Sequence, residues 1–245
     1  IIDLEHSPFD PTRLEAYLLG MTDKGQILRK GNLQPDVVPL VRIPTSGREQ
    51  LLCVVKQVLD LGVFGLVIPQ VESAAEARWA VQASRYPQRN GVADFEPTGW
   101  RGVGYGWPAR QWGLPGEEYA RRADVWPLDP DGELVLWAMI ETRRGIENCE
   151  AIARTPGIRG IFIGPSDLAF SLGVPLGDPA VEEAIGRIVT TCRRAGVATG
   201  TLVTTDDVDR RLRQGFAMLA LGGDLGLTDG VGEALRRAEA CLRKG

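Results

Sequence analysis

Short apolar runs alternate along this chain with segments of helical periodicity, and this alternation is the feature that most constrains the fold. The apolar runs end in polar or glycine residues and lie at Ile1–Asp3, Val37–Arg42, Phe64–Gln70, Leu134–Glu141, Ile158–Gly164, Val197–Val203 and Phe216–Gly222. Between most of them, apolar residues recur on one helical face, as Val181, Ile185 and Ile188 do. Continuous apolar strands are covered on both faces, so we predict repeated βα units around a parallel sheet.

The seven strand candidates are one fewer than a closed (β/α)8 barrel needs. We predict an α/β fold of this type, a TIM barrel. The missing strand lies either upstream of the chain or at Arg101–Tyr105. The chain starts without Met in an apolar run typical of a buried strand, which favours an upstream start. Its length of 245 residues fits one barrel, so we predict a single domain over residues 1–245.

One stretch, Pro87–Pro130, is rich in Gly, Pro and Trp and reads as an irregular insertion. Long loops inside compact domains are usually functional, as lids or as binding or assembly surfaces. The alternative is a surface insertion that packs on its own aromatic residues. Both interpretations remain open from the sequence.

The composition excludes several classes of partner. The formal net charge is −4 and basic residues are scattered, so no surface for nucleic acid or an anionic membrane is indicated. No run approaches the roughly 18 apolar residues of a membrane span. The four cysteines lack CxxC spacing, which argues against a zinc knot or a disulfide framework. We predict a reduced cytoplasmic protein with a small-molecule partner.

Polar residues at the ends of the apolar runs are the candidates for chemistry, because the carboxyl ends of parallel strands converge on one mouth of a barrel. Glu141 and Asp167 end consecutive strands, so their carboxylates can meet there. Two hard oxygen donors with open positions suit Mg²⁺ or Mn²⁺. The competing interpretation is that both carboxylates cap the helices that follow them.

The single histidine, His6, follows the first strand, and Asp3 is positioned to orient its ring as a general base. Arg42, at the end of the next strand, supplies a permanent cation for a carboxylate or an enolate. A structural role for His6 and an ion pair for Arg42 are the alternatives. The N–H groups of Ser166 and Asp167 begin a helix and can bind an anion.

Six segments together resemble the metal-dependent (class II) pyruvate aldolases. This family includes 4-hydroxy-2-oxoheptanedioate aldolase, 2-dehydro-3-deoxyglucarate aldolase and macrophomate synthase. The segments are IIDLEH, PLVRIP, KQVLDLGVFGLVIPQVESAAEAR, RGVG, IETRRGIEN and GIFIGPSDLAFSLG. The resemblance implies a barrel of the phosphoenolpyruvate/pyruvate type and a lyase that cleaves a 4-hydroxy-2-oxo acid to pyruvate and an aldehyde through a metal-bound enolate. It also implies a homo-oligomer, a hexamer or a trimer.

The same resemblance assigns roles to residues. Glu141 and Asp167 would hold Mg²⁺, Mn²⁺ or Co²⁺, and Arg42 would stabilise the enolate. His6 and Asp3 would form the base, and Ser166 and Asp167 would bind the substrate carboxylate through their N–H groups. Asp60 matches a family aspartate near the site.

The sequence departs from the family pattern at Met139, where members of the aldolase branch have Gln, and in the longer segment Gln88–Trp100. These departures favour one further activity, the decarboxylation of oxaloacetate with capture of the enolate. Cleavage of a CoA thioester is a second alternative, but the sequence shows no basic groove for a nucleotide diphosphate and its GPSDL turn fits the aldolases better. A non-catalytic barrel that binds a small acid is the alternative outside enzymes, although His6, Arg42, Glu141 and Asp167 are all present.

Overall fold

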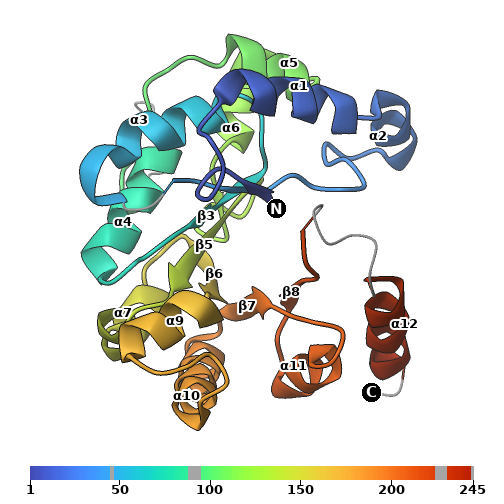
Figure 1. The fold of residues 1–245 in the computed structure, drawn as a ribbon. Coiled ribbons are helices and arrows are strands. Elements are labelled where there is room, and N and C mark those ends of the chain that lie inside the picture. Colours follow the sequence, from blue (N-terminus) through green and yellow to red (C-terminus); the bar gives the residue numbers. More distant parts are fainter. Residues whose placement is uncertain (45–46, 88–94, 224–230, 244–245) are drawn as a thin grey trace.

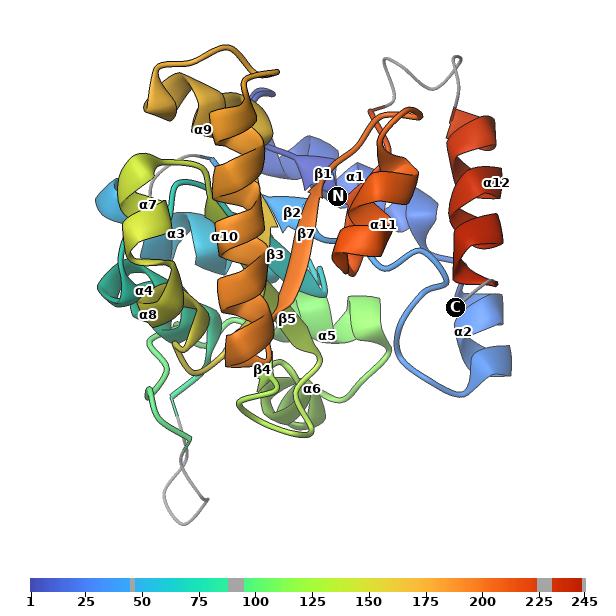
Figure 2. The same ribbon diagram turned by 90° about the horizontal axis from the view of Figure 1, so that it is seen from below.

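A computed structural model describes residues 1–44, 47–87, 95–223 and 231–243 and shows a curled parallel sheet with helices outside it (Figures 1 and 2). The strands of the described residues are β1 (Ile2–Asp3), β2 (Val41–Arg42), β3 (Gly65–Ile68), β4 (Val125–Trp126), β5 (Leu134–Ile140), β6 (Ile158–Ile163), β7 (Ala198–Leu202) and β8 (Met218–Ala220). Neighbouring strands pair in the order β1-β2-β3-β5-β6-β7-β8, and β4 pairs with β5 outside this path. The fold is thus a curled α/β sheet of the TIM-barrel kind.

Helices connect the strands. They are α1 (Pro11–Met21), α2 (Lys24–Lys30), α3 (Gly47–Leu59), α4 (Ala74–Ser84), α5 (Gly106–Trp112), α6 (Gly116–Arg122), α7 (Arg143–Glu147), α8 (Cys149–Ala153), α9 (Pro165–Leu172), α10 (Pro179–Ala195), α11 (Val208–Gln214) and α12 (Val231–Leu242). Local sequence sets their ends: the Ser73 side chain caps α4, and Gly196 ends α10 in the left-handed conformation. Among the described residues, no helix has the length and apolar character of a bilayer span.

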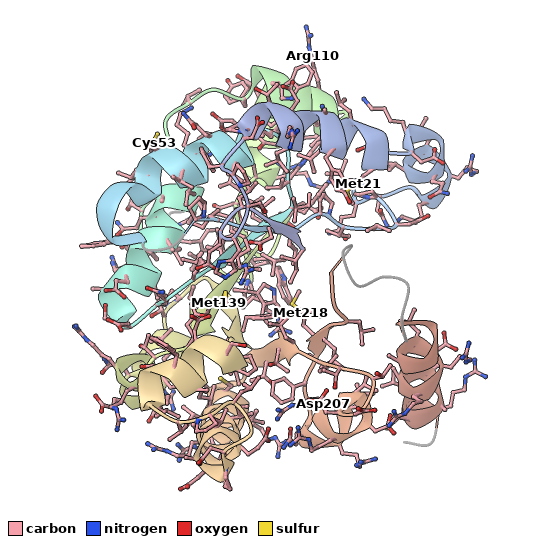
Figure 3. The ribbon with its side chains drawn as sticks, in the orientation of Figure 1. Met21, Cys53, Arg110, Met139, Asp207 and Met218 are labelled. Atoms are coloured by element: carbon pink, nitrogen blue, oxygen red, sulfur yellow. The ribbon has the colours of Figure 1, made fainter. Side chains whose placement is uncertain are left out.

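Side chains along β5 alternate between two apolar clusters, as the period of a strand requires. Leu136 and Ala138 belong to the large cluster between the sheet and the helices. Trp137 and Met139 belong to a smaller cluster, together with Val67 and Phe162, on the inner side of the curl. Figure 3 places Met139 near the middle of the molecule, inside the ring of helices.

The inner cluster depends on glycines in the neighbouring strands. A Cβ at Gly160 of β6 would overlap the ring of Trp137, and a Cβ at Gly200 of β7 would crowd Phe162 and Trp137. The indole therefore occupies space that these glycines leave open. The result is a closely packed apolar layer across the interior of the sheet.

All seven predicted strands form, although most are shorter than the apolar runs. The closed (β/α)8 barrel is not shown, because among the described residues the sheet has two free edges, at β1 and β8. The alternative strand at Arg101–Tyr105 is wrong. There the buried Arg101 side chain binds Asp60 and Tyr119, and Gly102 and Gly104 lie against Lys56. The eighth strand is β4.

The predicted irregular stretch 87–130 also contains two helices, α5 and α6, although residues 88–94 lie outside the described part. Its aromatic residues reach the core: Trp112 stacks on Phe64 with ring centroids 4.5 Å apart, and Tyr119 packs edge-on against Trp112 at 4.8 Å. Trp100 and Trp107 remain partly exposed. Core packing thus explains some of these aromatic residues.

The glycine requirement of the inner layer can be tested by comparing two identical substitutions. Gly160→Ala should lower the free energy of unfolding by about 1–3 kcal/mol, the usual cost of overpacking a core. Gly186→Ala, in α10 with no neighbour within 4 Å of the added methyl, should raise it by about 0.5–1 kcal/mol. Urea unfolding measures both, and equal effects would contradict this account of the interior.

Candidate active site

Strand alternation places Arg42 and Glu141 on the inner side of the sheet. Leu40 and Met139 contact the inner cluster. Arg42 and Glu141 each lie two residues further along and therefore face the same side. Arg42 is the last residue of β2 and Glu141 directly follows β5, so both lie at the carboxyl ends of their strands, above the apolar layer.

The first strand adds two acids by the same alternation. Ile2 and Leu4 pack into the outer cluster, so Asp3 and Glu5 face inward. The strand register sets Asp3 opposite Arg42. We predicted Asp3 as a site residue but did not predict Glu5, although its two-residue spacing from Asp3 was a signal for it.

Glu141 has a carboxylate that is held by backbone on two sides. Its Oε1 accepts a hydrogen bond of 2.7 Å from the N–H of Gln70. Its Oε2 faces Gly164, where any Cβ would overlap it. Gln70 has a φ of 50°, and it is the one non-glycine residue of the described ranges in the left-handed region. Strained backbone of this kind is often kept at functional sites.

The surroundings of Glu141 disfavour its negative charge. The residue is only 2% exposed. Burial raises the pKa of Glu141 from 4.5 to about 7, and the carboxylates of Glu5 and Asp167 act in the same direction. The N–H of Gln70 and the Arg42 guanidinium oppose this rise without overcoming it. Glu141 is therefore a buried acid within a cluster of acids.

Asp167 and Ser166 lie in the first turn of α9 and are exposed. No side chain caps this helix, and its first backbone hydrogen bond is donated by Leu168 to Gly164. The N–H groups of Ser166 and Asp167 are therefore not used within the helix. Asp167 is close enough to Glu141 to raise its pKa.

Arg42 forms ion pairs with two acids, Asp3 at the end of β1 and Glu5 just after it. Its Nε and Nη2 donate to the Asp3 carboxylate at 2.9 and 2.6 Å, and its Nη1 lies 3.1 Å from Glu5 Oε2. Burial acts to raise the pKa of Asp3, but the hydrogen bonds from Arg42 and from the Glu5 N–H outweigh it and hold that pKa below its ordinary value. Asp3 is thus an ionised partner of Arg42.

His6 lies at the edge of this cluster, with a side chain that is 62% exposed. We predicted that Asp3 orients its ring. In the structure the Asp3 carboxylate instead binds Arg42 and the backbone N–H groups of Glu5 and His6. The acid beside the ring is Glu5, whose Oε2 is 3.7 Å from His6 Nε2.

Asp60 is not brought to this cluster within one chain. It follows α3 and precedes β3, so it lies at the amino-terminal edge of the sheet, opposite the mouth. Its carboxylate accepts from Arg101 at 2.8 Å and from Lys56 at 2.5 Å. Asp60 was suggested by the family resemblance alone, and no local sequence pattern indicated its position at this edge.

The residues of the mouth fit a divalent cation. Asp3 is neutralised by Arg42, whereas Glu5, Glu141 and Asp167 leave an excess of negative charge around a buried carboxylate. Hard oxygen donors of this kind prefer Mg²⁺ or Mn²⁺. In the described part of the chain, no three His, Cys, Asp or Glu side chains form a ready metal site. A cation here would have two protein carboxylates and open positions for other ligands.

Residues 1–229 match the HpcH/HpaI aldolase/citrate lyase family. The chain is 33% identical over 231 residues to the 5-keto-4-deoxy-D-glucarate aldolase of Klebsiella pneumoniae, which covers 93% of this chain and 77% of that protein. The family match and this relative confirm the predicted class of enzyme, a carbon–carbon lyase of the aldolase type.

Solved structures agree with this relationship. A family protein from Burkholderia cenocepacia J2315 superposes with a TM-score of 0.73 and 28% identity, over 99% of this chain and 84% of that one. Macrophomate synthase superposes with a TM-score of 0.65 and 25% identity, over 99% of this chain and 77% of that one. The chain therefore belongs to the HpcH/HpaI aldolase/citrate lyase family.

Proposed function

We propose that this chain is a divalent-metal-dependent aldolase that cleaves a 4-hydroxy-2-oxo acid to pyruvate and an aldehyde. The observation that carries the proposal is the pairing of a buried, charge-disfavoured Glu141 with Asp167 beside a clamped Arg42. The family generally uses a divalent metal. We propose Glu141 and Asp167 as its ligands here and Mg²⁺ as the ion, with Mn²⁺ and Co²⁺ as substitutes.

The named relatives suggest the substrate class. 5-Keto-4-deoxy-D-glucarate has a carbonyl next to a carboxylate, followed by a methylene and a hydroxyl-bearing carbon. Read from that end, it is a 4-hydroxy-2-oxo acid. Cleavage between the methylene and the hydroxyl-bearing carbon releases pyruvate from one end and an aldehyde from the other.

The cleavage needs a base and a site for negative charge. A base removes the proton of the 4-hydroxyl, the carbon–carbon bond breaks to give the aldehyde, and the bonding electrons move to the 2-oxo oxygen as an enolate. Protonation of the enolate carbon completes pyruvate. His6, the single histidine, is the proposed proton carrier.

Arg42 is suited to the enolate oxygen. A guanidinium has five N–H donors, and three of them face Asp3 and Glu5. Beyond these contacts with the described residues Asp3 and Glu5, we propose that the other two N–H groups face the substrate. A preorganised cation of this kind favours the state in which negative charge has developed.

Different groups of the site would contact the enolate and the carboxylate of the substrate. A cation held by Glu141 and Asp167 would act as a Lewis acid that stabilises the negative charge of the enolate. The N–H groups of Ser166 and Asp167 would receive the substrate carboxylate at the start of α9. The apolar layer beneath, with Met139 next to Gly164, keeps water from the inner side.

A second candidate is the decarboxylation of oxaloacetate, which yields the same enolate by loss of CO₂. Two observations favour it: the likeness to macrophomate synthase and the apolar Met139 beside the site. Release of pyruvate from oxaloacetate faster than from any 4-hydroxy-2-oxo acid would favour this candidate.

The direct test is pyruvate release from 5-keto-4-deoxy-D-glucarate and related 4-hydroxy-2-oxo acids. EDTA should abolish turnover and added Mg²⁺ or Mn²⁺ should restore it, because the proposed site holds the ion by only two protein carboxylates and a chelator can remove it. A lactate dehydrogenase assay measures the pyruvate. Full turnover by metal-free protein would refute the proposal.

Gly164 provides a test of how Glu141 is positioned. Gly164→Ala should weaken Mn²⁺ binding and turnover by at least about tenfold, because the new methyl displaces Glu141 Oε2, and a shifted ligand costs 1.4 kcal/mol or more. Gly177→Ala, with open space around the added methyl, is the matched control and should change neither. Unchanged Mn²⁺ affinity in Gly164→Ala would contradict this role.

The raised pKa of Glu141 predicts a pH dependence of the metal-free protein. Between pH 4.5 and about 7 the unfolded state loses the Glu141 proton while the folded state keeps it. The free energy of unfolding should therefore fall across this window as pH rises, by at most about 3 kcal/mol. Glu141→Gln cannot ionise and should lack this part of the fall.

Urea unfolding in EDTA at several pH values measures the difference between wild type and Glu141→Gln. The difference should grow in favour of the variant as pH rises from 4.5 to 7. A constant difference would mean that Glu141 has an ordinary pKa.

A further inference from the structure

We propose that Glu5 is a positioning residue, which holds the Arg42 guanidinium in the orientation that stabilises the enolate. The inference rests on the proposed function and adds a residue to it. Glu5 acts through Arg42 and is not itself a metal ligand or a substrate contact.

The geometry shows a clamp with two carboxylates. Asp3 binds one edge of the guanidinium through Nε and Nη2, and Glu5 Oε2 lies 3.1 Å from Nη1. The Glu5 N–H also donates to Asp3 Oδ1 at 2.9 Å, so a short turn ties the two acids together. All three guanidinium nitrogens therefore face acids of one chain segment.

The Glu5 carboxylate contacts Nη1 of Arg42, which Asp3 does not contact. Asp3 alone would leave Nη1 without an acid partner, and the plane of the guanidinium could tilt about the remaining edge. With Glu5 in place the plane is set from two sides, and the two remaining N–H groups keep one direction. Preorganised donors avoid the cost of reorienting when charge develops.

Glu5 is costly in this position, which argues for a specific role. Its side chain is only 5% exposed and adds to the negative charge that disfavours ionised Glu141. A buried acid next to other acids is retained only if it makes a compensating contact. Across the described residues, Glu5 does not join two further acidic, His or Cys side chains in a group that could hold a metal, and its 3.1 Å contact with Arg42 is the compensating contact that the structure shows.

His6 is the weaker partner of Glu5. Its Nε2 is 3.7 Å from the same Oε2, beyond hydrogen-bond distance, and the imidazole is 62% exposed. Arg42 is closer and its side chain is 19% exposed. Of these two partners, Arg42 therefore makes the closer contact with Glu5.

The substitution that tests the proposal is Glu5→Gln, which keeps the shape and removes the charge. The assay is exchange of the pyruvate methyl hydrogens for deuterium in D₂O with Mg²⁺, followed by NMR. This reaction needs the enolate but no aldehyde. We expect the rate at saturating pyruvate to fall about 10- to 100-fold, the range for a lost hydrogen bond to a charged group. Half-saturation should change little.

Two variants serve as references. Glu147→Gln removes an exposed carboxylate near the same end of the sheet and should leave exchange unchanged. In an Arg42→Ala background, Glu5→Gln should cause no further loss, because a residue that acts through Arg42 has nothing left to position. An undiminished loss in that background, or a loss that disappears only in His6→Ala, would overturn the proposal.

Binding measurements separate this inference from the proposed function. Mn²⁺ affinity should survive Glu5→Gln but not Glu141→Gln, and its loss in Glu5→Gln would make Glu5 a ligand instead.

The ¹⁵N relaxation of the Arg42 Nε–H group tests the clamp without any enzyme activity. The order parameter of this group should fall in Glu5→Gln and not in Glu147→Gln. If wild-type protein exchanges no deuterium, the proposed function fails. Unchanged Arg42 order in Glu5→Gln would refute the clamp on its own.

Discussion

The burial of the Glu141 carboxylate beside other carboxylates is the constraint on which the rest of the site depends. The N–H of Gln70 donates a hydrogen bond to one carboxylate oxygen, and the absence of a side chain at Gly164 leaves room for the other. Burial and the acids Glu5 and Asp167 disfavour its charge. The ionised carboxylate is unfavourable here unless a proton or a cation neutralises it. We interpret the strain at Gln70 and the crowding of acids as the cost of a prepared cation site.

Strand alternation places the part of this site that the sheet supplies, whereas Asp167 comes from the first turn of α9. One set of side chains on each strand packs under the helices, and the other set fills the interior with Trp137 and its neighbours. The same alternation, followed to the carboxyl ends of β2 and β5, places the Arg42 and Glu141 side chains above the inner apolar cluster. The interior layer and the site are thus successive parts of the same inner face, and a change in strand register would move both.

Much of this arrangement could be predicted from the sequence, because apolar runs and their polar ends are local patterns. The seven strands, Glu141 and Asp167 follow from them. Pairing between distant segments could not be predicted in the same way. Asp3 was matched to His6 by spacing, yet the strand register sets it opposite Arg42. The helices α5 and α6 were missed because Gly and Pro mask a stretch whose aromatic residues pack on Phe64.

The central claim is that Glu141 and Asp167 hold a divalent cation next to Arg42. The most direct measurement is anomalous diffraction from crystals grown with Mn²⁺ and oxalate, a stable mimic of the pyruvate enolate. The account predicts one strong Mn²⁺ peak within bonding distance of both carboxylates, with an oxalate oxygen facing the Arg42 guanidinium. A peak held by other residues, or no Mn²⁺ peak at millimolar concentration, would contradict it.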